Sequence, residues 1–317
     1  MPTIDRVAFS VFGIDIYWYA IIIVCGMIVG ITSALLLAKY KKLDVDALFD
    51  MILFVIPIGI IGARLYYVIT DWDETWTFAK IFAIRDGGLA IYGGVIAGAL
   101  TAIVVAKIKK MKPIDLLAAL DVFVVGVIIG QSIGRWGNFV NQEAYGQLIT
   151  NPALQFFPMA VYVHGSWYHA TFFYESMWNL VGYALLLILN LKKPDWRGIS
   201  CCSYFVYYGL GRAWIEGLRS DSLYFLKNIL GETIRISQML SVLLVIAGIA
   251  GIIAIVKIDK VHPEYNLLGR AKASVPVTAN GADASESQAE EEVSDDDKNE
   301  QTKTSEENAS ADKKEEE

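Results

Sequence analysis

Residues 116–146 read LLAALDVFVVGVIIGQSIGRWGNFVNQEAYG, an apolar run that ends in a polar segment with three glycines. The apolar part of this stretch is a candidate membrane span. It is short for one, because a full span needs about 20 apolar residues. Directly after it stand one cation, two carboxamides and one carboxylate: Arg135, Asn138, Asn141 and Glu143. Polar groups at the edge of hydrocarbon are costly and indicate a functional site. A headgroup anchor would explain one arginine, but four polar groups among glycines favour a ligand site.

The overall composition is that of an integral membrane protein. Hydrophobic residues make up 55% of the 317, and the mean hydropathy is +0.43. The net charge is −7, but residues 283–317 alone hold 15 acids against 4 lysines, so the remainder is +4. Residues 263–317 lack apolar periodicity, and we expect a disordered acidic cytoplasmic tail there. Neither a nucleic-acid partner nor a metal site is expected.

Seven stretches are candidates for membrane spans. They cover residues 17–38, 47–69, 88–106, 116–133, 171–191, 199–216 and 236–256. The predicted fold is therefore an all-α polytopic membrane protein with seven transmembrane helices. A short extracytoplasmic segment, 1–16, precedes a transmembrane domain, 17–262, which includes a small outside loop at about 147–170.

Basic residues occur in every second connection, after the first, third, fifth and seventh spans. They are Lys39, Lys41 and Lys42; Lys107, Lys109, Lys110 and Lys112; Lys192, Lys193 and Arg197; and Lys257 and Lys260. Lipid-binding lysines are an alternative explanation, but the alternation fits the positive-inside rule better. This rule places the amino terminus outside and the carboxyl terminus in the cytoplasm.

With this orientation, six spans bring polar side chains to one depth near the outer surface. Besides Arg135 to Glu143, these residues are Tyr17, Tyr19, Arg64, Arg85, Asp86, Tyr92, His169, Tyr174, Glu175, Arg212, Glu216 and Arg219. Charged groups inside a membrane face a cavity or find partners. We therefore predict a polar cavity at the level of the outer leaflet. An anionic phospholipid headgroup is the ligand that explains its depth.

Two arginines are the strongest candidates for binding phosphate, Arg135 and Arg212, because a guanidinium group presents parallel donors and keeps its charge. Tyr208, Arg212, Glu216 and Arg219 follow helical spacing and share a face. Glu216 could form a structural ion pair with Arg212. The same pair could also aim Arg212 at a ligand, so the two roles are compatible. Glu143 and Glu175 could likewise orient arginines or act as acid or base.

These residues together resemble the bacterial prolipoprotein diacylglyceryl transferase family. The principal motif is Gly134-Arg135-x-Gly-Asn138-Phe-x-Asn141-x-Glu143-x-x-Gly146. Further matching segments are Tyr17-Trp18-Tyr19, Gly62-Ala-Arg64, Arg85-Asp86-Gly87-Gly88, Tyr174-Glu175 and Tyr208-x-x-x-Arg212-x-x-x-Glu216-x-x-Arg219. The resemblance covers about residues 17–262 and excludes the acidic tail.

The resemblance implies transfer of diacylglyceryl from phosphatidylglycerol to the lipobox cysteine thiol of a preprolipoprotein, with release of glycerol 1-phosphate, in the bacterial cell membrane. No cofactor is implied, because arginines can neutralise the leaving phosphate. The implied catalytic residues are Arg135, Arg212, Tyr92 and Glu216. The implied substrate-binding residues are Arg135, Asn138, Asn141, Glu143, Gly146, Tyr19, Arg64, Glu175, Tyr208 and Arg219. Asn138 and Asn141 would orient the lipid, and the three glutamates, Glu143, Glu175 and Glu216, would hold the cations.

Two positions depart from the family pattern. Tyr92 stands where many members carry a histidine regarded as a candidate base, and a phenol is a weak base at neutral pH. We expect Tyr92 to hydrogen-bond the headgroup. Ala170 replaces the proline that usually follows His169, and no catalytic role is assigned to His169.

Two other classes of function remain as alternatives. A lipid or solute transporter would also line a cavity with arginines, but we find no internal repeat of the kind that many transporters show. A non-catalytic membrane scaffold would leave the convergence of charged groups unexplained.

Overall fold

The computed structural model describes residues 5–72, 76–83, 87–163, 165–219, 224–229 and 232–270. Long helices dominate this part of the chain. They are α1 (Trp18–Tyr40), α2 (Val45–Thr70), α4 (Ile91–Ile108), α5 (Pro113–Asn141), α6 (Thr171–Lys192), α7 (Ile199–Leu218) and α8 (Ile236–Val261), with a short α3 (Phe78–Phe82). Each of the seven predicted spans coincides with one long helix.

Six of these helices, α1, α2, α4, α5, α6 and α8, are long and apolar enough to cross a membrane. The chain is therefore a polytopic helical membrane protein. The helix α7 is 20 residues long but is not in this set, and it carries Arg212 and Glu216. Polar residues of this kind lower the hydropathy of a helix.

The fourth predicted span ends too early. It was expected to stop at residue 133, but α5 continues for two further turns to Asn141. Packing explains the continuation. Gly137 leaves room for the ring of Tyr19, which lies 2.6 Å from where a Cβ would stand. Trp136 donates its indole N–H to Ser176 of α6 at 3.1 Å. These contacts outweigh the low helix propensity of glycine and asparagine.

Three small antiparallel hairpins accompany the helices. They are β1–β2 (Val7–Val11 and Ile14–Tyr17), β3–β4 (Ala160–Val163 and Ser166–His169) and β5–β6 (Tyr224–Ile229 and Glu232–Arg235). The hairpin β3–β4 occupies the predicted outside loop. Strands of four to six residues have a weak sequence signal, so the hairpins and α3 were not predicted.

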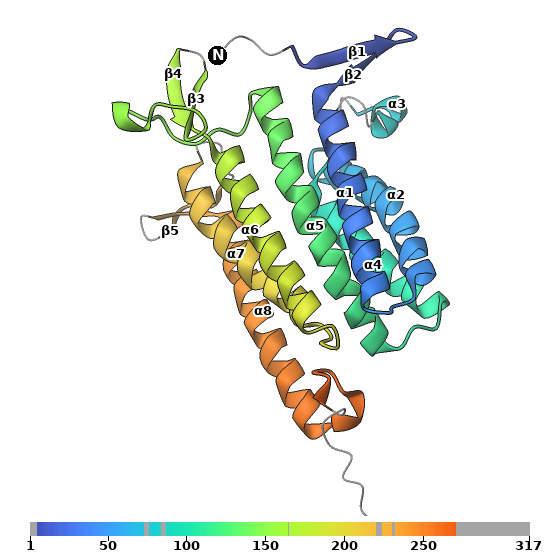
Figure 1. Ribbon diagram of the computed structural model, residues 1–317. Helices are drawn as coiled ribbons and strands as arrows, with labels where there is room; N and C mark the ends of the chain where they lie inside the picture. Colours follow the sequence, from blue (N-terminus) through green and yellow to red (C-terminus); the bar gives the residue numbers. More distant parts are fainter. Residues whose placement is uncertain are drawn as a thin grey trace, which may run out of the picture. The chain divides into compact units, whose positions relative to one another are not determined.

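The helix connections separate into two ends of the bundle. In Figure 1 the hairpins β1–β2 and β3–β4 lie together at one end, which we call the hairpin end. The α1–α2, α4–α5 and α6–α7 connections and the end of α8 carry the basic residues, and we call this the lysine-rich end. Beyond α8 the described chain extends to residue 270, past the predicted start of the tail, and Leu267 and Leu268 are buried there. The acidic residues from 283 onward lie outside the described residues.

Two helix pairs approach closely through glycine. Between α1 and α5, a Cβ at Gly30 would stand 2.5 Å from the carbonyl oxygen of Gly126. Between α2 and α4, a Cβ at Gly62 would stand 2.8 Å from the carbonyl oxygen of Gly93. Only glycine permits such spacing, which is typical of helix contacts in membranes. Gly30 and Gly62 therefore serve the close packing of their helices.

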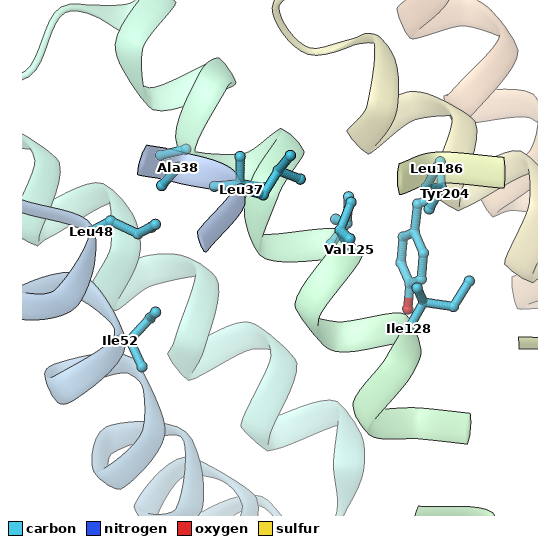
Figure 2. Packing of buried hydrophobic residues seen from close by; sticks show 11 residues of the cluster. Leu37, Ala38, Leu48, Ile52, Val125, Ile128, Leu186 and Tyr204 are labelled. Carbon is cyan, nitrogen blue, oxygen red and sulfur yellow. The ribbon is translucent and has the colours of Figure 1, made fainter. Parts of the chain in front are cut away.

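A hydrophobic core joins five of the helices (Figure 2). Its buried residues include Leu37 and Ala38 of α1, Leu48 and Ile52 of α2, Val125 and Ile128 of α5, Leu186 of α6 and Tyr204 of α7. The α1 and α2 residues of this cluster lie near the α1–α2 connection. The core therefore fixes α1 and α2 to α5 from the lysine-rich end.

Candidate functional site

The last two turns of α5 supply the first part of the site. Arg135 Nη1 lies 3.5 Å from the side-chain oxygen of Asn138. The side-chain amides of Asn138 and Asn141 each donate to Glu143 Oε1 at 3.1 Å. Glu143 lies just after the end of α5. Its hydrogen bonds fix the two carboxamides rather than an arginine. This differs from the expectation that Glu143 holds a cation.

Glu175 links two arginines from different helices. Its Oε1 atom accepts from Arg135 Nη2 of α5 at 2.7 Å and from Arg212 Nη1 of α7 at 3.1 Å. The Glu175 side chain is 4% exposed, whereas those of Arg135 and Arg212 are 24% and 19% exposed. A buried carboxylate between two cations is electrostatically compensated. Three helices are thus held together by one charged group.

The second carboxylate of this cluster is Glu216. Its Oε2 atom lies 2.9 Å from Arg212 Nη2, one helical turn away on α7. The ion pair considered from the sequence is therefore present, and it coexists with the contact of Arg212 to Glu175. Two arginines and two glutamates sum to zero charge when all are ionised. A ligand would consequently be recognised by directed N–H donors more than by net charge.

A cavity of about 420 Å³ opens beside this cluster. Its polar lining consists of Tyr19, Gln131, Arg135, Asn138 and Tyr208. The rest of the lining is apolar or glycine, from helices α1, α2, α4 and α5; it includes Ile23, Met27, Ile31, Ile52, Ile56, Ile91, Phe123 and Val127. A long apolar cavity with a guanidinium group at one end matches an amphiphile with an anionic head. Such a combination of apolar walls and few polar groups is typical of ligand sites.

The two arginines have different relations to this cavity. Arg135 lines it, together with Asn138, while Arg212 is not among its lining residues in the described chain. Arg212 contacts Glu175 and Glu216. A guanidinium group has five N–H donors, so the contacts of Arg135 with Glu175 and Asn138 leave donors for a ligand. Arg135 is therefore the cation that a cavity ligand meets directly.

Arg64 occupies a separate position near the end of α2. Its guanidinium group donates to the backbone carbonyls of Ile81 at 3.0 Å and of Gly87 and Gly88 at 2.6 and 2.9 Å. It also lies 5.5 Å from the ring centre of Trp76. Arg64 thus fastens α3 and the segment before α4 to α2. It does not contact the Arg135 cluster within the described residues.

Three other predicted residues, Tyr92, Gly146 and Arg219, are not among the described residues that line the cavity. Tyr92, at the start of α4, is 36% exposed and packs against Tyr66, with 6.3 Å between ring centres. Gly146 donates its N–H to the carbonyl of His169 at 2.9 Å and pairs with Arg219 in a β-bridge. Gly146 and Arg219 therefore join the segment after α5 to the end of α7. Arg85 and Asp86 lie outside the described residues.

His169 lies in β4, outside the membrane-spanning helices. Its Nδ1 atom is 3.2 Å from the hydroxyl of Tyr174, which donates to the carbonyl of Met159 at 2.6 Å. Burial lowers the pKa of His169 below its ordinary value. These contacts place His169 in the packing of the β3–β4 hairpin against α6.

Gln131 is a cavity residue that the sequence prediction omitted. Its amide pairs with the hydroxyl of Tyr204, which lies 3.0 Å from Nε2 and 3.3 Å from Oε1. Glutamine in an apolar run carries no motif of its own. The only available signal was its spacing, since Gln131 precedes Arg135 by four residues and therefore shares its helix face.

The lysine-rich end holds a second buried polar cluster. Lys41 Nζ donates to Asn190 Oδ1 at 2.8 Å and lies 3.9 Å from Asp121 Oδ2, and the Lys41 and Asp121 side chains are 0% exposed. Asp121 accepts the backbone N–H groups of Gly198 and Cys201 at 2.6 and 2.8 Å, at the start of α7. Burial lowers the pKa of Lys41 to about 8, against the opposing effect of Asp121.

Comparison with known proteins gives one consistent result. A family model described as prolipoprotein diacylglyceryl transferase matches residues 6–254. The chain is 42% identical over 243 residues to the phosphatidylglycerol–prolipoprotein diacylglyceryl transferase of Finegoldia magna, covering 76% of this chain and 92% of the relative. It is 43% identical over 248 residues to the protein of that name from Streptococcus mutans, covering 77% and 92%.

Proposed function

Because this chain belongs to the prolipoprotein diacylglyceryl transferase family, we propose that the Arg135–Glu175–Arg212–Glu216 cluster is its active site. The chain is a transferase that moves a diacylglyceryl group from phosphatidylglycerol to prolipoprotein. The observation that carries the assignment of the site is the position of Arg135, at the polar end of an apolar cavity and tied to α6 and α7 through Glu175. The transporter alternative receives no support from the named relatives.

The reaction at this site is a displacement at carbon. The thiol of the lipobox cysteine loses its proton, and its sulfur attacks the glyceryl carbon that bears the phosphate. A C–S bond forms as the C–O bond breaks, and glycerol 1-phosphate leaves with the bonding electrons on a phosphate oxygen, which takes up the proton released by the thiol. Since the thiolate is the reactive form of cysteine, nearby arginines also favour the nucleophile.

Arg135 is assigned to the phosphate. The phosphate of the bound lipid lies at the arginine, and the two acyl chains extend along the apolar lining of the cavity. Guanidinium donors aimed at the oxygen where charge develops stabilise the departing phosphate, and one such donor is worth about 100- to 1,000-fold in rate. Arg212 adds a second positive charge behind Glu175, and Glu216 fixes its orientation.

The remaining predicted residues orient the lipid. Asn138 lines the cavity and is held between Arg135 and Glu143, while Asn141 shares the same carboxylate. Tyr19 and Tyr208 also line the cavity and present hydroxyl groups to the headgroup region. Tyr92 hydrogen-bonds the headgroup and does not serve as the base. Gly146 and Arg219 support the site by joining the segment after α5 to the end of α7, and Arg64 fixes the segment before α4 to α2.

In the membrane, the hairpin end faces outward and all seven long helices span the bilayer. The basic residues of alternate connections support this orientation by the positive-inside rule. It brings the active site to the outer leaflet and the carboxyl terminus to the cytoplasm. The helix α7 is the seventh span, because its charged residues find partners inside the bundle and need not face lipid.

The direct experiment uses membranes with phosphatidylglycerol and a lipobox peptide. Wild-type protein is expected to attach labelled diacylglyceryl to the cysteine of the peptide. Arg135→Lys and Asn138→Ala should insert normally but lose this attachment. Full activity of both variants would refute the assignment of the site, and a wild-type protein without transfer would refute the reaction.

A further inference from the structure

Gln131 is the deepest polar group along the α5 face of the cavity. It lies four residues before Arg135 on the same helix, and at 1.5 Å per residue this is about 6 Å further toward the lysine-rich end. Beyond it, the α5 residues lining the cavity are Gly130, Val127, Gly126 and Phe123, which have no polar side chains. The proposed mechanism makes no use of this amide.

Tyr204 holds the Gln131 side chain in place. A single hydroxyl group lies 3.0 Å from Nε2 and 3.3 Å from Oε1 of Gln131. Tyr204 is itself 8% exposed and stacks on Tyr208, with 5.6 Å between ring centres. A carboxamide has two N–H donors, and one hydroxyl oxygen can take only one at this geometry. Among the residues that the structure describes, Tyr204 is the only side-chain partner of Gln131, so the second N–H is available to a molecule in the cavity.

We propose that Gln131 donates this N–H to an acyl ester carbonyl of the bound phosphatidylglycerol. The inference rests on the proposed function, which places the phosphate at Arg135. In a glycerophospholipid, the two ester groups are the polar groups that come next after the phosphate, and beyond them there is only hydrocarbon. The cavity has the same order: guanidinium, then amide, then apolar wall. Gln131 is therefore a specificity-determining residue that sets the depth of the lipid, and Tyr204 is its positioning residue.

This role has a chemical consequence for the choice of lipid. A dialkyl ether analogue of phosphatidylglycerol has the same headgroup and chains but lacks both carbonyl oxygens. Binding it would leave the Gln131 N–H unpaired in an apolar cavity. A site built to hydrogen-bond its ligand discriminates against the analogue that lacks the partner. The loss of one neutral hydrogen bond should lower kcat/KM for the diether lipid by about three- to tenfold relative to the diester.

The test compares diester and diether phosphatidylglycerol with identical chain lengths as donors to a lipobox peptide. Each variant is characterised by its ratio of kcat/KM for the two lipids, so that differences in the amount of folded protein cancel. Wild type should favour the diester by about three- to tenfold. Gln131→Met, which keeps the length of the side chain, should bring the ratio close to one. Tyr204→Phe should reduce the ratio partly while Gln131 remains.

Ser132→Ala is the matched control. Ser132 is the next residue of α5, but its hydroxyl contacts Ser176 of α6 instead of the cavity, so its ratio should equal that of wild type. An unchanged ratio in folded Gln131→Met, or a wild-type ratio of one, would overturn the inference. If Gln131→Met does not fold, the Tyr204→Phe ratio decides alone. A wild type that uses neither lipid would instead refute the proposed function.

Discussion

The bundle has a charged cluster at each end, and the two clusters differ in how completely the protein satisfies them. At the lysine-rich end, Lys41 and Asp121 are 0% exposed, and Asp121 caps the start of α7 through two backbone N–H groups. At the hairpin end, Arg135 is 24% exposed and lines an open cavity. Both clusters join α5 to α7.

This difference separates a structural clamp from a binding site. Buried ions are tolerated when partners satisfy them, and the Lys41 cluster meets that requirement within the protein. Arg135 is anchored by Glu175 but retains N–H donors directed at a space that a ligand can fill. Hence a buried charged cluster is not sufficient to identify a site. The open cavity and the donors left for a ligand are the additional indications.

The largest effect is expected from Arg135→Lys. A lysine keeps the charge but loses the parallel donors that bind phosphate and Glu175 together. Transfer to a lipobox peptide should fall by about 100-fold or more. The same substitution at the other end, Arg197→Lys, is the control, because Arg197 contacts the carbonyl of Pro194. If both substitutions lowered transfer equally, the two ends would not differ in function.

A smaller loss is expected from Glu175→Gln. The amide keeps the shape but cannot neutralise Arg135 and Arg212, so both guanidinium groups lose their common anchor. Transfer per folded molecule should fall by about 10- to 100-fold, less than for loss of the phosphate ligand itself. Melting temperature and initial rates measured on the same preparation distinguish a misfolded protein from a folded protein whose two arginines are misplaced. Wild-type rates in a folded Glu175→Gln protein would contradict the anchoring role.

Tyr92→Phe should lower transfer by less than about tenfold, the value of one hydrogen bond. Loss of a general base costs about 100- to 10,000-fold. Steady-state rates of the variant therefore decide between the two roles. A loss of 100-fold or more would show that Tyr92 takes part in proton transfer.

The smallest effect on transfer is expected from Lys41→Met. Removing one partner of a buried pair lowers the free energy of unfolding by about 3 kcal/mol, while transfer per folded molecule should stay close to that of wild type. Tm and specific activity measured together check this expectation. A selective loss of activity without a change in Tm would assign the lysine-rich end a functional role.

The stability effect of Lys41 depends on pH. Its folded pKa is about 8, below the ordinary value of 10.5, so protonation favours the unfolded chain. The stability that neutral Lys41 provides is present above the unfolded pKa and is lost as pH falls through about 8. Wild-type Tm should therefore rise relative to Lys41→Met between pH 8 and pH 10. A difference in Tm that does not change over this range would contradict the lowered pKa.

Periodic and local features could be predicted from the sequence, but long-range pairings could not. Each predicted apolar run is a helix, and the motif residues Arg135, Asn138 and Glu143 do converge. The extension of α5 past residue 133 was missed because glycine and asparagine suggest a helix end. The contacts of Gly137 with Tyr19 and of Trp136 with Ser176 reverse that preference.

The clamp at the lysine-rich end was missed for a related reason. Lys41 counted as one of several loop lysines that set topology, and its partner Asn190 is 149 positions away in the sequence. No spacing rule connects residues so far apart. The contact of Gln131 with Tyr204, 73 positions apart, was hidden in the same way. Therefore, only the structure could show which residues line the cavity.

The most direct test measures how phosphatidylglycerol changes the Tm of the purified protein, with phosphatidylcholine as the matched lipid. A ligand that binds only the folded state raises Tm. The rise specific to phosphatidylglycerol should be present in wild type, absent in Arg135→Lys, and undiminished in Lys41→Met despite its lower starting Tm. A rise that survives in Arg135→Lys, or one that disappears in Lys41→Met, would contradict the assignment of the lipid to the hairpin end.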